Sequence, residues 1–285
     1  MHVYACLAEF KDFMREQGST SLGSNQDATM LSVLESASRR IDEFCQRSLY
    51  GTGFGPRIGT NKYDSSGGNC LWLNDDLITT TKVTDRASTS DAGTDITADT
   101  DYFLQTGAGA YGDPPYRRLV IHDAATTLGQ FGSGFRTIDV VGTWGYPYVT
   151  RTLVPTTAEA LDATEQEIDV SALTGISPGM TLLIEAEQVY VSATTDAVTD
   201  SITVDRGVNG TTAAVHLTGQ AISRIIYHAP IVDACNRVAL RRWRSRDAGA
   251  DGMDGGGQVG SIVPREGEDL ILRRTVGHLR LDLVP

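Results

Sequence analysis

A change of hydrophobic period near Gly51 constrains the fold of this chain more than any other feature of its sequence. Before that point apolar residues recur every three or four positions, a spacing that predicts helices. After it, apolar and polar residues alternate in short runs separated by glycine, aspartate, serine and proline, which predicts strands. Helical spacing returns only near residue 229. The order of helices, strands and helix predicts an α+β protein with antiparallel sheets.

The helical spacing predicts three helices, at 4–17, 27–49 and 229–246. In the first, Leu7, Phe10 and Met14 share one face, and Gly18 would end the helix. After the third comes DAGADGMDGGGQVGS (247–261), whose glycine content and polarity predict a flexible linker. The final stretch, 268–285, regains apolar spacing and is expected to dock as a short segment.

Between the helices, the alternating runs fall into two groups. The first group predicts an antiparallel sheet with strands at 70–73, 77–83, 101–105, 117–122 and 136–144. The second group, at about 155–224, contains the five short runs EIDV, TLLIE, QVYVSA, SITVD and QAISRII. Because it brings no helix of its own, this group must close its core by folding the sheet on itself, which predicts a small barrel or sandwich.

Composition limits the classes of function. The hydrophobic fraction of 40% and charged fraction of 21% are those of a soluble globular protein and exclude a disordered or fibrous chain. No apolar run is long enough for a membrane span, and no leader precedes the first helix, so we expect a cytoplasmic protein. The net charge of −12 argues against gripping nucleic acid through its phosphates, although DNA could slide past such a surface. The four cysteines are far apart and are expected to be buried thiols.

The polar clusters do not predict a metal or catalytic site. The loop at 88–101 carries Asp91, Asp95, Asp99 and Asp101 without the ligand order of a calcium loop, and 247–257 lacks a closing glutamate. Five histidines lie scattered, with no HExxH and no nucleophile motif. We therefore expect no cofactor, no metal and no enzymatic activity.

One loop invites closer attention, VDRGVNGTTAAVHLTGQAI at 204–222. It could be a ligand loop, a catalytic loop around His216, or a structural turn. Gly207 and Gly210 permit positive φ, Asn209 tolerates it, and the threonine hydroxyls can satisfy backbone groups of the loop. We favour a long turn that closes the second β group.

The densest basic patch lies on the third predicted helix. Arg237, Arg241 and Arg244 line up on the face opposite Cys235 and Trp243. This face could be merely solvated, could contact nucleic acid, or could contact a subunit or partner, because guanidinium groups fork onto carboxylates. The candidate contact residues, from this helix and the C-terminal segment, are Arg237, Arg241, Arg244, Leu270, Ile271, Arg273 and Arg274.

The order of these elements resembles the head-to-tail connector, or adaptor, proteins of tailed double-stranded DNA phages. In that family a helix pair, here ending in LSVLESASRRIDEFCQRSL (31–49), leads into strands, and a strand with a GT-aromatic-G pattern precedes a helix that begins with proline. The matching positions here are Val140, Gly142, Thr143, Trp144 and Gly145, then Pro230, Ala234, Ala239, Trp243 and Arg244. Residues 146–229 separate the two elements, where the family has a few residues, and this extra length matches the second β group.

The resemblance implies a helical connector core with an antiparallel β-sheet and an inserted all-β barrel or sandwich. The domains would be 1–150, connector core; 151–226, inserted β domain; and 227–285, connector core continued. It implies a virion neck protein, present in the host cytoplasm before assembly, that forms a ring of twelve subunits. Its partners would be the portal protein, a tail or stopper protein and further copies of itself, with DNA passing through without specific binding.

Two alternatives remain at this stage. A tail-completion or stopper protein would occupy the next layer of the same neck. A β-module binding protein, for example one that binds carbohydrate, would use the second β group alone, although the helical frame weighs against it.

Overall fold

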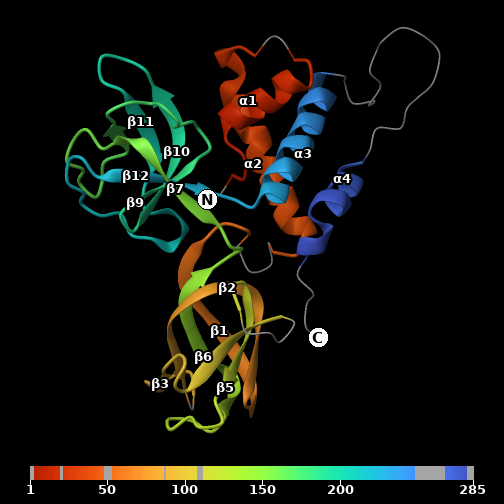
Figure 1. Ribbon diagram of the computed structural model, residues 1–285, viewed down its shortest axis with the longest axis vertical. Helices are drawn as coiled ribbons and strands as arrows, with labels where there is room; N and C mark the ends of the chain where they lie inside the picture. Colours follow the sequence, from red (N-terminus) through yellow and green to blue (C-terminus); the bar gives the residue numbers. More distant parts are fainter. Residues whose placement is uncertain are drawn as a thin grey trace, which may run out of the picture. The chain divides into compact units, whose positions relative to one another are not determined.

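The computed structural model describes residues 3–19, 22–47, 53–86, 88–107, 112–247 and 267–280 (Figure 1). Internal contacts divide the chain into two compact units. The first unit comprises Met1–Leu49 and Val149–Arg280, and the second comprises Tyr50–Tyr148 and Leu281–Pro285. The predicted linker beyond Asp247 and the last part of the predicted docking segment, 281–285, lie outside the described residues.

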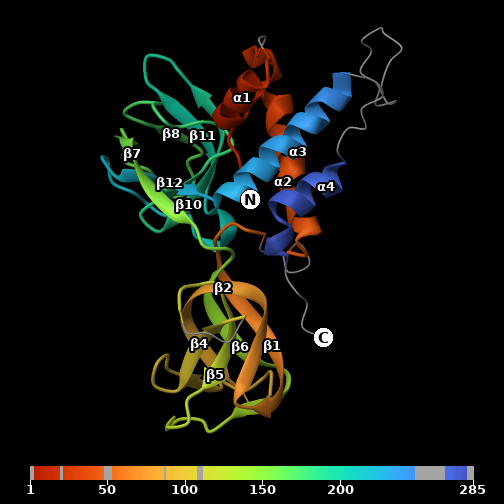
Figure 2. The ribbon, with the colours of Figure 1, turned by 45° about the vertical axis from the view of Figure 1, so that its right-hand side comes forward.

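Four α-helices form the helical part of the first unit. They are α1 (Leu7–Glu16), α2 (Asp27–Phe44), α3 (Ala229–Asp247) and α4 (Glu268–Thr275), with 3-10 turns η1 (Ser24–Gln26) and η4 (Gly277–Leu279). α3 packs along α2, and α1 and α4 lie on either side of α3 (Figure 2). Each helix buries the stripe expected from its spacing, for example Leu7, Phe10 and Met14 in α1.

The second helix is shorter than its sequence predicts. Its spacing predicts a helix to residue 49, but α2 ends at Phe44. Gln46 adopts a positive φ of 60°, a left-handed conformation that stops a helix even without glycine. The next residue, Arg47, is buried and donates to the carbonyl of Leu279 at 3.3 Å, which fixes the chain just after the helix.

The remainder of the first unit is a six-stranded antiparallel sheet. Its strands are β7 (Val149–Thr156), β8 (Glu167–Asp169), β9 (Thr181–Ile184), β10 (Glu187–Thr195), β11 (Ser201–Asp205) and β12 (Ala221–Ile226), with η3 (Val208–Gly210) in the last connection. They are ordered β7-β12-β9-β10-β11-β8. A bridge between Thr157 and Val170 joins the two outer strands at one end, so the sheet curls around one apolar core.

Cys6, at the start of α1, belongs to that core. The backbone N–H of Leu7 donates to the carbonyl of Pro178 at 2.9 Å, and that of Ala8 to the hydroxyl of Ser177 at 3.1 Å. The start of α1 therefore satisfies its unpaired N–H groups on the sheet. Cys45 and Cys235 are also buried, as expected, whereas Cys70 is half-buried.

The second unit is a six-stranded antiparallel sheet with its own core. Its strands are β1 (Arg57–Gly68), β2 (Cys70–Asp85), β3 (Thr94–Ile96), β4 (Tyr102–Thr106), β5 (Tyr116–Ile121) and β6 (Phe131–Trp144). Their order is β1-β6-β2-β5-β4, with β3 paired to β2. Trp144 is fully buried in this core, and its indole N–H donates to the carbonyl of Gly59 at 3.1 Å.

A helical connector core is not what the chain forms, and that prediction is wrong. Over the described residues, 39% lie in strands and 26% in helices, and the strands make two antiparallel sheets of six. The physical reason is that each sheet buries a separate set of apolar residues, so most of the hydrophobic core is built by strands rather than by helices.

Candidate functional site

The helical part of the first unit carries a groove that brings together several of the predicted contact residues. The groove encloses about 220 Å³. We call it the arginine groove; its lining residues are Phe13, Gln17, Arg237, Leu240, Arg241, Arg244 and Ile271. Thus α1, α3 and α4 each contribute to one surface.

The spacing of the arginines on α3 places them along the groove. Arg237, Arg241 and Arg244 are separated by four and three residues, which puts their side chains on one face of the helix. Arg237 pairs with Asp233 one turn earlier, at 2.8 and 2.9 Å. Arg244 donates to the carbonyl of Gln17 at the end of α1, at 3.2 Å. These contacts hold two of the guanidinium groups in place beside the apolar floor.

Apolar side chains from all three helices form that floor. Leu240 is buried, while Phe13 and Ile271 are half-buried. Three of the predicted contact residues lie elsewhere: Leu270, Arg273 and Arg274 are exposed on α4 and do not line the groove. Sequence reasoning missed Phe13, Gln17 and Leu240. Phe13 lies beside the buried stripe of α1, three residues after Phe10, so this helical spacing could have indicated that Phe13 lies near the packed face of the helix.

α4 is fastened to the other helices by charge and by apolar packing. Arg242 donates to both oxygens of Glu268, at 2.9 and 3.0 Å, and Arg40 contacts Asp269 at 2.7 Å. The hydrogen bonds from Arg242 lower the pKa of Glu268. Leu272 and Val276 are fully buried beneath these pairs. This fastening sets the position of Ile271 at the edge of the arginine groove.

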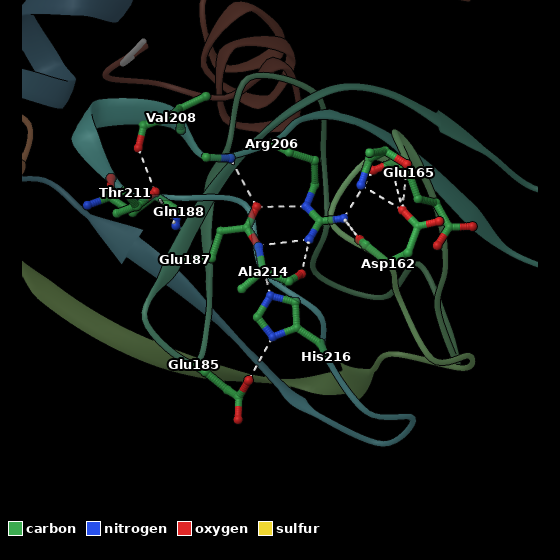
Figure 3. A network of polar contacts seen from close by, with 12 residues as sticks. Asp162, Glu165, Glu185, Glu187, Gln188, Arg206, Val208, Thr211, Ala214 and His216 are labelled. Carbon is green, nitrogen blue, oxygen red and sulfur yellow. Dashed lines mark hydrogen bonds and ion pairs between the residues drawn. The ribbon is translucent and has the colours of Figure 1, made fainter.

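The loop at 204–222 is organised by one carboxylate (Figure 3). Glu187, at the start of β10, accepts hydrogen bonds from Arg206 at 2.7 and 2.8 Å. The same carboxylate accepts from the backbone N–H groups of Gly207 at 2.9 Å and Ala214 at 3.1 Å. Burial alone would raise the pKa of Glu187, but the hydrogen bonds from Arg206, His216 and the backbone lower it to about 2. We call this arrangement the Glu187 clasp.

His216 completes the clasp. Its Nε2 lies 2.8 Å from Glu187 and its Nδ1 2.7 Å from Glu185, and only 2% of the residue is exposed. Figure 3 shows the ring between the two carboxylates. Each ring nitrogen thus lies within hydrogen-bond distance of a carboxylate. The ring is therefore occupied in holding the loop, which is the structural turn that the sequence favoured.

Arg206 extends the clasp to a third segment of the unit. Its guanidinium also donates to the carbonyls of Asp162 and Glu165, at 2.9 and 3.1 Å, and of Ala214 at 2.7 Å. Gly207 and Asn209 adopt positive φ, both at 59°, as expected of a turn at these residues. The loop thus folds around two buried charges that satisfy each other.

Carboxylates of the acidic loop make local contacts. Asp95 accepts from Lys82 at 2.9 Å and from Thr84 at 2.7 Å, while Asp101 accepts from the N–H groups of Thr97 and Thr127. In the part of the chain that the structure describes, no three His, Cys, Asp or Glu side chains are grouped to hold a metal ion. The second acidic run, 248–257, lies outside that part. No described helix has the length and apolar character to cross a membrane.

Comparison with family models, with curated proteins and with solved structures finds no match to this chain.

Proposed function

We propose that this chain is a structural protein of the neck of a tailed phage, which assembles as a ring between the portal and the tail and lets DNA pass. The observation that carries the proposal is the arginine groove, in which Arg237, Arg241 and Arg244 border an apolar floor on an otherwise acidic chain. Arginines beside a partly exposed apolar pocket are typical of the centre of a protein–protein interface. Such a protein would act through the surfaces that it presents to its partners and not through a catalytic or ligand-binding site.

The residues on which the family resemblance rests give further support, because most of them have packing roles. A Cβ on Gly142 would stand 2.1 Å from the carbonyl oxygen of Thr79, so β6 can approach β2 only with glycine there. Pro230 lies in the first turn of α3, a position that suits its fixed φ. Ala234 and Ala239 are fully buried on α3. These residues therefore serve the packing of β6 and α3, which form part of the framework of the fold.

Arg244 differs from the other matching positions. It is exposed and lines the arginine groove. One exposed, charged side chain on such a packed framework suits a protein that acts by presenting a surface to a neighbour. The resemblance implies a ring of twelve subunits, in which each copy contacts two neighbouring copies, and the portal and a tail or stopper protein are the further partners.

The net charge of −12 fits the passage of DNA. Acidic subunits around a channel would repel phosphate groups and keep the DNA from adhering. The proposal therefore combines a contact surface whose arginines lie on α3 with a chain that is acidic overall.

The test is to image the neck of particles that carry a tagged copy of this chain. The expected result is a ring of tag density next to the portal, and capture of portal protein by the purified chain. A chain that is absent from particles and does not bind portal would overturn the proposal.

A further inference from the structure

We infer that the arginine groove receives an apolar side chain flanked by carboxylates from a second copy of this chain, in a head-to-tail contact. The inference deepens the proposed function and rests on it for one point, the expectation that copies of the chain meet in a ring. The physical argument for the occupant comes from the size, charge and geometry of the groove.

The size of the groove favours a side chain over a small molecule. Sites for cofactors and drug-sized ligands enclose roughly 300–1,000 Å³. The groove encloses about 220 Å³ and is open to solvent. It can hold one or two protein side chains above Leu240, between Phe13 and Ile271.

The charge of the groove selects an acidic occupant. Arg237, Arg241 and Arg244 line the groove and no acidic residue does, although Arg237 is already paired with Asp233. The chain as a whole carries 36 acidic and 24 basic residues, so its own surface supplies the complementary charge. A second copy is therefore an electrostatically suitable partner.

Geometry favours carboxylates on a regular element. Along the axis of α3, Arg237 and Arg241 are separated by a helical rise of about 6 Å, and Arg241 and Arg244 by about 4.5 Å. A guanidinium presents five N–H donors in a fixed plane and can bind a carboxylate through two of them. Arg244 donates one hydrogen bond to Gln17, which orients the group while leaving donors for a partner.

The same charge determines the symmetry of the contact. Two grooves cannot face each other, because three arginines would then meet three arginines. The groove must meet a different, acidic surface of the next copy, which is a heterologous contact. Repeated heterologous contacts close into rings or extend into filaments.

The groove would be the centre of a larger interface. A stable interface buries about 1,200–2,000 Å² in total, and most of its binding energy comes from a few central residues such as arginine and aromatic side chains. Arg241, Arg244 and Ile271 would be such residues, and exposed surface around them would complete the contact.

The experiment compares two double charge reversals by sedimentation velocity. Arg241→Glu with Arg244→Glu changes the groove, and Arg273→Glu with Arg274→Glu makes the same change in charge on exposed positions of α4 that do not line it. We expect the wild type to self-associate, more weakly at high salt, and the groove variant to associate at least tenfold more weakly. The α4 variant should stay within about twofold of the wild type.

Circular dichroism and thermal unfolding show that each variant is folded. If the groove reversal unfolds the helices, Arg241→Gln with Arg244→Gln gives the same test without reversed charge. A wild type that is monomeric at every concentration would overturn the inference, as would equal weakening by the two charge reversals.

Particle imaging separates this inference from the proposed function. Copies that associate through the groove but never enter particles would leave the inference standing and remove the function. Groove variants that still build the neck ring would remove the inference and leave the function.

Discussion

Glu187 and Arg206 meet through two hydrogen bonds of 2.7 and 2.8 Å, between side chains that are only 1% and 5% exposed. Two charges buried in this way depend on each other, because removing one would leave the other buried without hydration and without a counter-charge, which is unfavourable in free energy. The geometry of a loop that contains Gly207, Ala214 and His216 depends on the same carboxylate.

Replacing Glu187 by glutamine should destabilise the first unit strongly. The substitution keeps the size of the side chain but leaves the Arg206 guanidinium buried without a counter-charge, and breaking such a pair costs roughly 3–5 kcal/mol. Glu185→Gln is the matched control, since that side chain is half exposed and contacts the His216 ring, and it should cost less than about 1 kcal/mol. Urea unfolding measures both, and similar losses for the two variants would contradict a dominant role of the clasp.

Acid should weaken the Glu187 clasp over a defined range of pH. The pKa of Glu187 is about 2 in the folded chain and 4.5 when unperturbed, so the unfolded chain binds the proton first as the pH falls. The stabilisation is therefore complete above about pH 4.5 and is lost between about pH 4.5 and 2, by on the order of 3 kcal/mol. The difference in unfolding free energy between wild type and Glu187→Gln should shrink from about pH 7 to about pH 3. A constant difference would argue that the carboxylate is not held as an anion.

Gly142→Ala should disrupt the second unit. The new methyl group would stand 2.1 Å from the Thr79 carbonyl oxygen and 3.1 Å from Leu77, so β2 and β6 would have to separate. We expect a loss above the roughly 1–3 kcal/mol typical of overpacking. Gly129→Ala is the control, because a Cβ there meets nothing within 4 Å. Thermal unfolding with hydrogen exchange should show loss of protection in β2 and β6 for the first variant only.

Exchanging the charges of Arg242 and Glu268 should first loosen and then restore α4. Arg242→Glu alone places two carboxylates where a pair now stands at 2.9 and 3.0 Å, so amide exchange in α4 should accelerate. Adding Glu268→Arg should recover part of the protection, with a coupling of about 1 kcal/mol for this partly exposed pair. Arg273→Glu serves as the control on an exposed position of the same helix. Additive effects in the double variant would show that the pair does not fasten α4.

Helices were predictable from the sequence because their signal is local. Leu7, Phe10 and Met14 recur at helical spacing and are all buried in α1. The end of α2 was not predictable, because the left-handed Gln46 carries no sequence signal of a stop.

The amount of strand was underestimated because charged residues interrupt a long strand. Asp75 and Asp76 resemble a turn between two short strands, yet β2 runs through them from Cys70 to Asp85. Both residues are buried, and the pairing with β5 shifts register between Trp72 and Leu77. Such a bulge depends on neighbouring strands, which a single run of sequence does not reveal.

The candidate site was predictable on one helix only. The face of Arg237, Arg241 and Arg244 follows from spacing, but Phe13 joins it through the packing of a helix more than 200 residues earlier in the chain. The Glu187 clasp was missed for the same reason, since Glu187 and His216 meet only when β10 and the loop are folded together.

Because the Glu187 carboxylate holds Gly207, Ala214 and His216, the exposed positions near these residues are free to vary. Thr212, Val215 and Leu217 point outward, whereas Arg206, Ala214 and His216 are tied to Glu187 or its partner. Changes at the outward positions alter what the loop displays without altering its path. The loop is thus a site at which an epitope or a label can be introduced while the contacts to Glu187 keep its backbone in place.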